Sequence, residues 1–150
     1  MNANIKNIRH TGIVVSDMER SLGFYRDLMG LRTLIDFGEE GVFIDTISNL
    51  KNVRLRMVKL VTEDGSMVEL LHYASHSQPE RVENKLCELG PTHIAFTVDD
   101  IDQIYASWSA KGVKCNSAPV VSPDGKAKLF FCQDPDGTFL EIVQMLEDND

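Results

Sequence analysis

The sequence lacks most of the features that mark secreted, membrane and nucleic-acid-binding proteins. Among its 150 residues are only three cysteines, Cys87, Cys115 and Cys132. Their odd number and wide spacing predict neither a disulfide framework nor a CxxC metal site. No apolar run approaches the roughly 20 residues that span a bilayer, and the opening MNANIKNIRH has no apolar segment typical of a signal peptide. We therefore expect a cytoplasmic protein.

Basic residues are also scarce, because 15 lysines and arginines stand against 23 aspartates and glutamates and the net charge is −8. Such a balance disfavours a nucleic-acid backbone or an anionic membrane as the partner. The content of 43% hydrophobic and 25% charged residues is that of an ordinary globular domain. A small-molecule substrate is the expected partner, and the length fits one domain or two small modules that share a core.

Two segments of the chain repeat one another. Residues 8–32, IRHTGIVVSDMERSLGFYRDLMGLR, align with residues 91–114, PTHIAFTVDDIDQIYASWSAKGVK, so that His10 falls on His93. A second pattern, DG-x-x-x-E, occurs as DGSMVE and as DGTFLE and places Glu69 on Glu141. The two histidines are 83 residues apart and the two glutamates 72, so the first copy is about eleven residues longer than the second. We place this extra length in a loop region around residues 38–52.

Each copy opens with an alternating strand, residues 10–15 and 93–98, that runs into a helix. The predicted helix starts are Ser16 with Glu19 in the first copy and Asp99 with Asp102 in the second. Apolar residues then recur at helical spacing. They are Met18, Leu22, Tyr25 and Leu28 in the first helix and Ile101, Ile104, Tyr105 and Trp108 in the second. Gly30 and Gly112 are the predicted C-terminal caps.

Three strands are expected after each helix, and Asp-Gly turns join the last two of them. The turns are Asp64–Gly65 and Asp136–Gly137. The expected strands are residues 31–37, 53–62 and 66–73, and then residues 113–119, 126–133 and 138–145. The predicted fold class is therefore α+β, with two tandem βαβββ modules at residues 5–73 and 91–146. A linker of residues 74–90, partly helical around 79–89, joins them into one domain.

Histidines and glutamates occupy corresponding strand positions in the two copies. His10 alternates with Thr11 and Ile13 and so shares a face with the small Gly12, and His93 likewise shares a face with Ala95. A single strand glutamate is usually structural, but a repeated pair is not expected by chance. If His10, Glu69, His93 and Glu141 converge, they form a two-nitrogen, two-oxygen site for a divalent metal. The metal would offset the cost of removing both carboxylates from water.

The segments RHTGIVVSDMERSLGFYRDLMGL, THIAFTVDDID and DPDGTFLEIVQ resemble the vicinal oxygen chelate superfamily. Its members include glyoxalase I, methylmalonyl-CoA epimerase, extradiol dioxygenases and fosfomycin-resistance proteins. The resemblance covers about residues 5–146 and implies a cupped mixed sheet around a metal held by His10, Glu69, His93 and Glu141. It also implies a homodimer, in which the four ligands come from one chain or from two.

The ligand order His-Glu-His-Glu is similar to that of glyoxalase I. The resemblance implies a metal-dependent lyase or isomerase that chelates vicinal oxygens and shifts a proton through an enediolate. The expected metal is Ni, Co, Zn or Mn, and either Glu69 or Glu141 is the catalytic base. The segment LLHYASHSQ after Glu69 lacks the asparagine-containing stretch that helps hold glutathione in glyoxalase I, which leaves the use of glutathione open.

Three alternatives stay open at the level of sequence. A methylmalonyl-CoA-type epimerase usually has glutamine at the place of Glu69. An Fe(II) extradiol-type dioxygenase needs only three protein ligands and keeps three positions for substrate and oxygen. A non-enzymatic binding protein of the same fold usually lacks the ligand set. The charged strand residues Arg54, Arg56, Lys126 and Lys128 are interpreted as solvated or paired, although one of them could face an anionic substrate.

Overall fold

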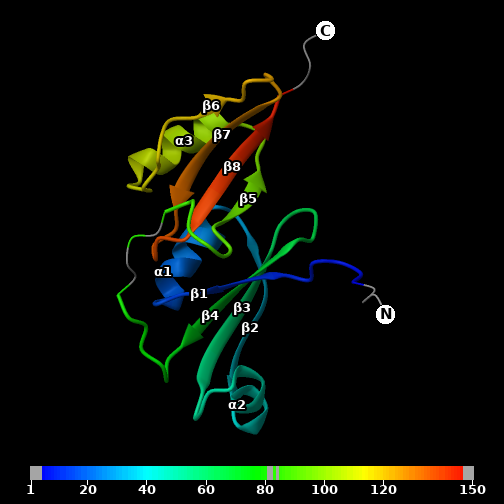
Figure 1. The fold of residues 1–150 in the computed structure, drawn as a ribbon, viewed down its shortest axis with the longest axis vertical. Helices are drawn as coiled ribbons and strands as arrows, with labels where there is room; N and C mark the ends of the chain where they lie inside the picture. The colour runs from blue at the N-terminus through cyan, green and yellow to red at the C-terminus, as the bar shows by residue number, and fades with distance from the viewer. Residues whose placement is uncertain (1–4, 81–82, 84, 147–150) are drawn as a thin grey trace. The chain divides into compact units, whose positions relative to one another are not determined.

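A computed structural model describes residues 5–80, 83 and 85–146 of the chain. The chain divides into two compact units, unit 1 up to Pro79 and unit 2 from Glu80 onward, and each is described by itself (Figure 1). Both units combine helices with a mixed four-stranded sheet, which confirms the α+β class. In the described ranges we find no helix with the length and apolar character needed to cross a membrane.

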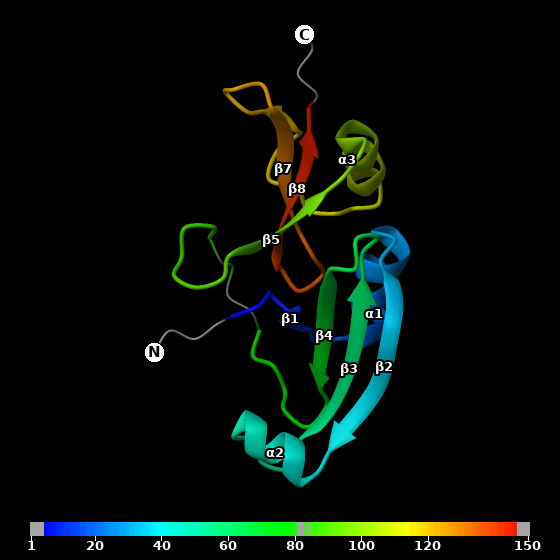
Figure 2. The same cartoon turned by 90° about the vertical axis from the view of Figure 1, so that its right-hand side faces the viewer.

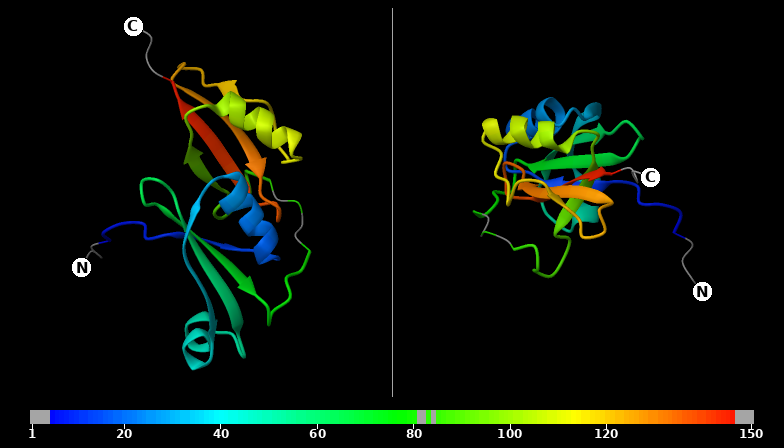
Figure 3. Two further views of the ribbon diagram at one scale, coloured as in Figure 1. Left: turned by 180° about the vertical axis from the view of Figure 1, so that it is seen from behind. Right: turned by 90° about the horizontal axis from the view of Figure 1, so that it is seen from above.

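Unit 1 forms a sheet of strand order β1-β4-β3-β2 (Figure 2). Its elements are β1 (Thr11–Val14), α1 (Met18–Leu22), a π-helix η1 (Gly23–Leu28), β2 (Arg32–Glu40), α2 (Val42–Ser48), β3 (Arg54–Val61) and β4 (Met67–Tyr73). Strand β1 runs parallel to β4, whereas the other neighbours are antiparallel. The helix α1 contacts β4 on one face of this sheet, as seen from behind in Figure 3.

Unit 2 repeats this plan in the order β5-β8-β7-β6. Its elements are β5 (His93–Thr97), α3 (Ile101–Ala110), β6 (Val120–Val121), β7 (Ala127–Gln133) and β8 (Phe139–Met145). Strand β5 is parallel to β8, and α3 contacts β8 (Figure 3). The two expected βαβββ modules are thus both present, one in each unit.

The two helices begin one residue later than the sequence predicted. The N-caps are Asp17 and Asp100, whose carboxylates accept hydrogen bonds from the backbone N–H groups of Arg20 and Gln103, both at 3.0 Å. The sheet ladder explains the shift, because the N–H of Val15 still bonds to Leu71 at 2.9 Å. The chain is therefore still held to the sheet at Val15 and Val98, and capping passes from Ser16 to Asp17 and, in unit 2, from Asp99 to Asp100.

The predicted glycine ends of both helices are confirmed. Gly30 and Gly112 have φ of 82° and 83°, a conformation that costs glycine little. The next residue closes each helix end, since the N–H of Leu31 bonds to Tyr25 at 3.1 Å and that of Val113 bonds to Trp108 at 3.0 Å.

Both Asp-Gly turns form as predicted and fix the register of the strands that follow. Gly65 and Gly137 have φ of 87° and 84°. In unit 1 the hairpin places Glu69 opposite Lys59, and in unit 2 it places Glu141 opposite Phe131.

Three boundary predictions were wrong. The strand expected at residues 113–119 is reduced to one bridge between Cys115 and Cys132, followed by the two-residue β6, because Pro119 has no N–H to donate to a ladder. The extra length of residues 38–52 is only in part a loop, because β2 extends to Glu40 and α2 covers Val42–Ser48. The described residues of 79–89 contain no helix, and residues 81, 82 and 84 of that range lie outside the description.

Candidate metal-binding site

The alternation of strand side chains separates a buried face from a face that carries the histidines. Six apolar side chains of unit 1 share one face of the sheet and are each no more than 6% exposed, namely Ile13, Val15, Val58, Leu60, Val68 and Leu70. The opposite face holds Gly12, Lys59 and Glu69, which are cross-strand neighbours on β1, β3 and β4. We call this the histidine face of unit 1, since His10 precedes β1 by one residue and reaches Glu69.

The first histidine and glutamate form a close pair. His10 Nε2 lies 3.5 Å from Glu69 Oε1, and the Glu69 side chain is only 8% exposed. Within the described part of the chain, His10 Nδ1 is buried without a hydrogen-bond partner. Two polar groups are therefore held on a sheet face at a desolvation cost that internal hydrogen bonds do not fully compensate.

A lysine that the sequence analysis did not single out joins this pair. Lys59 Nζ lies 3.4 Å from Glu69 Oε2, so the two oxygens of Glu69 face different partners. The Lys59 side chain is 17% exposed. Lys59 stands directly across from Glu69 because the register of this hairpin is centred on Asp64. A two-residue turn at Asp64–Gly65 would instead place Leu60 there, so the turn motif alone did not predict this lysine.

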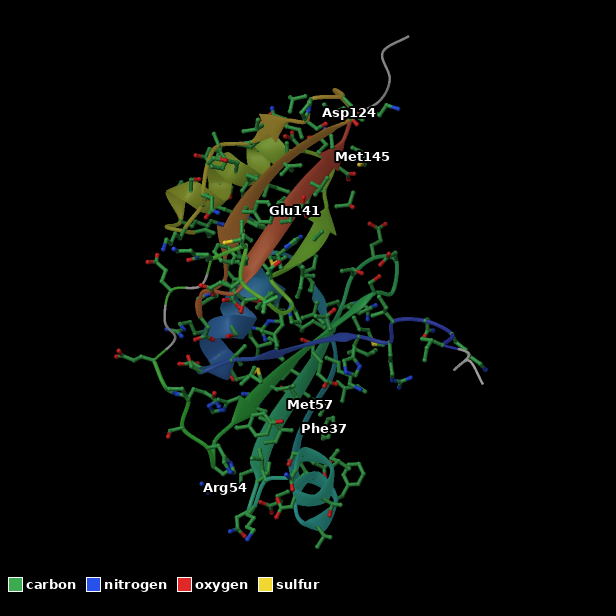
Figure 4. The ribbon with its side chains drawn as sticks, viewed as in Figure 1. Phe37, Arg54, Met57, Asp124, Glu141 and Met145 are labelled. Carbon is green, nitrogen blue, oxygen red and sulfur yellow. The ribbon has the colours of Figure 1, made fainter. Side chains whose placement is uncertain are left out.

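The second histidine and glutamate form the corresponding pair in unit 2. His93 Nε2 lies 3.2 Å from Glu141 Oε2, and the Glu141 side chain on β8, labelled in Figure 4, is 21% exposed. The other ring nitrogen of His93 lies 2.9 Å from Thr92 Oγ1. Phe131 takes the place that Lys59 has in unit 1, and its ring meets the His93 ring edge-on with centroids 5.2 Å apart.

The geometry of each pair suits two ligands of one ion. Zinc–nitrogen and zinc–oxygen bonds are about 2.1 Å long, so two ligands of one ion at right-angled to tetrahedral separation lie about 3.0 to 3.5 Å apart. The observed separations of 3.5 and 3.2 Å match this range. When Thr92 accepts the Nδ1 proton of His93, the Nε2 lone pair is left to face Glu141 and is available to a metal.

The structure thus brings the four predicted ligands together two by two. His10 and Glu69 meet in unit 1, and His93 and Glu141 meet in unit 2. Nowhere in residues 5–80, 83 and 85–146 does a group of three or more His, Cys, Asp or Glu side chains stand in a metal-binding arrangement. The four-ligand centre stays a prediction.

Two of the four strand cations of the sequence analysis, Arg56 and Lys128, form structural ion pairs. Arg56 forms ion pairs with Glu19 of α1 and with Asp36, whose Oδ2 lies 2.8 Å from Arg56 Nη2. The guanidinium lowers the pKa of Asp36 through this hydrogen bond. Lys128, at the corresponding place in unit 2, bonds to Asp102 of α3. Both units therefore tie their third strand to their helix through the same kind of contact.

The cysteines occupy three different environments. Cys87 is exposed, Cys115 is half-buried and Cys132 is buried, and all three are free thiols. Burial raises the pKa of the Cys132 thiol to about 12. Thiolate chemistry at neutral pH is correspondingly disfavoured at this position.

Comparison with known proteins assigns the fold and the family. Residues 7–142 match the model of the Glyoxalase/Bleomycin resistance protein/Dioxygenase superfamily. The uncharacterized protein YaeR of Escherichia coli is 29% identical over 93% of this chain and 97% of its own length. A lactoylglutathione lyase of Pseudomonas aeruginosa is 32% identical over 90% of this chain and 80% of its own length.

The crystal structure of a glyoxalase family protein from Bacillus cereus shares the fold, with a TM-score of 0.86 at 22% identity over 98% of this chain and 100% of its own. The family match extends over both units and includes all four of the paired histidines and glutamates. The chain belongs to the glyoxalase/bleomycin resistance protein/dioxygenase superfamily.

Proposed function

We propose that this protein is a metal-dependent lyase or isomerase that acts on a small substrate with two adjacent oxygen atoms. The observation that carries the proposal is the repeated pair. Each unit presents one histidine nitrogen and one glutamate oxygen at the spacing of two ligands, on the sheet face opposite its helix. The relation to lactoylglutathione lyases supports the same reaction class.

The two pairs together supply the ligands of one divalent ion, Ni, Co, Zn or Mn. His10 and Glu69 come from unit 1, and His93 and Glu141 come from unit 2 of the same chain or of a second copy in a homodimer. When bound, the ion acts as a Lewis acid that polarises a substrate carbonyl and so acidifies the neighbouring C–H. The homodimer and the cytoplasmic location stay predictions.

The contacts of the two glutamates favour different roles for them. Glu69 is held between His10 and Lys59, which ties both of its oxygens in place. Among the described residues, Glu141 has His93 as its one ionisable partner and is the more exposed of the two carboxylates. We assign proton transfer to Glu141, which is freer to turn toward a substrate carbon, and a fixed ligand role to Glu69.

Elemental analysis of the purified full-length protein tests the metal site. We expect about one divalent ion per chain in the wild type and a reduced content in His10→Ala and Glu69→Gln, since each removes a ligand. His72→Ala is the matched control, because His72 lies on β4 three residues from Glu69 and on its other face. Absence of metal after incubation with Ni, Co, Zn and Mn in turn would show the pairs to be structural.

Turnover measurements test the role of Glu141. With 2-oxoaldehyde hemithioacetals as first substrates, Glu141→Gln should keep most of the metal while kcat falls by about 10²- to 10⁴-fold, as expected for loss of a general base. Full turnover in this variant, with metal bound, would contradict the assignment.

A further inference from the structure

We propose that Lys59 makes the site selective for substrates that carry a carboxylate beside the two chelated oxygens. The juxtaposition behind this inference is a nearly buried lysine on the histidine face of unit 1, 3.4 Å from the glutamate of the first pair. The inference rests on the proposed metal-dependent function and names its substrate class.

The strand neighbours of Lys59 on its own face are apolar except for Glu69. Across the sheet its neighbour on β2 is Ile35, and Met57 and Val61 flank it on the same face of β3. Figure 4 labels Met57 close to Phe37, its partner on β2. Within the described residues, Glu69 is the one acidic group that pairs with Lys59. An ammonium group has three donors, so at least two are left for a ligand.

Glu69 does not need a lysine in order to occupy a strand of this fold. At the corresponding position of unit 2, Glu141 stands across from Phe131 instead of a cation. The cations that serve structure are repeated in both units, as Arg56 with Glu19 and Lys128 with Asp102 show. Lys59 has no such counterpart, which separates it from the structural ion pairs.

The charge balance indicates what Lys59 recognises. A divalent ion held by two neutral histidines and two glutamates leaves no net charge on the proposed centre. Lys59 adds one positive charge, in surroundings where screening by solvent is weak. A substrate with one carboxylate within reach of Nζ restores neutrality and gains a charge-assisted hydrogen bond.

A matched pair of ligands tests the inference by isothermal titration of the Zn-loaded full-length protein. Succinic monohydroxamic acid offers two adjacent oxygens and a carboxylate, and its methyl ester offers the same oxygens without the charge. We expect the acid to bind the wild type about 10- to 100-fold more tightly than the ester, the range for a hydrogen bond to a charged group. Lys59→Met should bring the two affinities together.

Lys128→Met is the matched control, because Lys128 is also a strand lysine with one acidic partner and a 23% exposed side chain. It should retain the preference of the wild type, and Lys59→Arg should retain part of it. Circular dichroism of each variant verifies folding, and equal binding of acid and ester by the wild type refutes the inference without any variant.

The outcomes separate the two proposals. If the wild type takes up zinc and binds acid and ester equally, the selectivity of Lys59 is refuted and the metal site stands. Preference for the acid that survives in Lys59→Met also refutes it. If the wild type takes up none of Zn, Ni, Co and Mn, the proposed function fails, and the role of Lys59 fails with it.

Discussion

The same substitution at the two paired glutamates should have very different effects on stability in the absence of metal. Glu69→Gln removes the one acidic group that pairs with Lys59 among the described residues, and the Lys59 side chain is only 17% exposed. Glu141→Gln affects His93, whose ring also meets the ring of Phe131, and exposes no paired lysine among the described residues. We expect the first change to destabilise the protein clearly and the second to have little effect.

The magnitude follows from the separation of the charges. Two unit charges 3.4 Å apart attract one another by about 5 kcal/mol at an effective dielectric constant of about 20. Hydration of the released lysine recovers part of this energy, so Glu69→Gln should lower the free energy of unfolding by about 2 to 3 kcal/mol. For Glu141→Gln, which breaks one contact of the partly exposed His93, we expect about 1 kcal/mol or less.

Urea unfolding in the presence of a chelator, followed by circular dichroism, measures both effects. The double variant Lys59→Met with Glu69→Gln should regain at least half of the stability lost in Glu69→Gln, since no unpaired charge is left. Equal losses in the two single variants, or no recovery in the double variant, would refute the reasoning.

Three further predictions concern the scaffold. Arg56→Met should lower the free energy of unfolding by only about 0.5 kcal/mol, because the pair with Asp36 is partly exposed. Since Arg56 lowers the pKa of Asp36, this stabilisation is present above the ordinary carboxylate pKa and is lost as pH falls through the lowered pKa. Urea unfolding at pH 7 and at pH 3 would detect the difference. Gly65→Ala should lower the free energy of unfolding by about 1 kcal/mol, because alanine is strained at the φ of 87° that Gly65 adopts. Urea unfolding measures this loss, and an unchanged stability would contradict backbone strain at this position. At pH 8 iodoacetamide should modify exposed Cys87 in the native protein and leave Cys132, with its pKa of about 12, unmodified by peptide mass mapping; equal labelling would contradict its burial.

Periodicity and turn chemistry predicted the parts of the fold that depend on neighbouring residues. The Asp-Gly turns, the glycine helix ends and the two modules follow from short patterns that each copy repeats. The helix starts were misplaced by one residue because a long-range bond, from the N–H of Val15 to Leu71, decides where the strand ends. No local pattern contains that bond.

The candidate site was predictable to the extent that its residues repeat. His10 and Glu69 were found because His93 and Glu141 lie at matching places, and the structure brings each pair within 3.5 Å. The sequence did not predict Lys59 as a site residue, because this lysine occurs in one copy only and its place beside Glu69 depends on the cross-strand register. The helix α2 has no counterpart in the second copy, so the repeat could locate the extra residues but not their conformation.

The Asp64–Gly65 turn determines which residue of β3 lies across from Glu69 in unit 1. One residue inserted there, with β4 kept in place beside β1, would put Leu60 in place of Lys59 across from Glu69 and turn the lysine toward α1. Insertions between β2 and β3, where the two copies already differ in length, leave the register of β3 and β4 unchanged. The chain can therefore change in length between β2 and β3 without consequence for Glu69. One residue added between β3 and β4 would replace the charged neighbour of this proposed metal ligand by an apolar one.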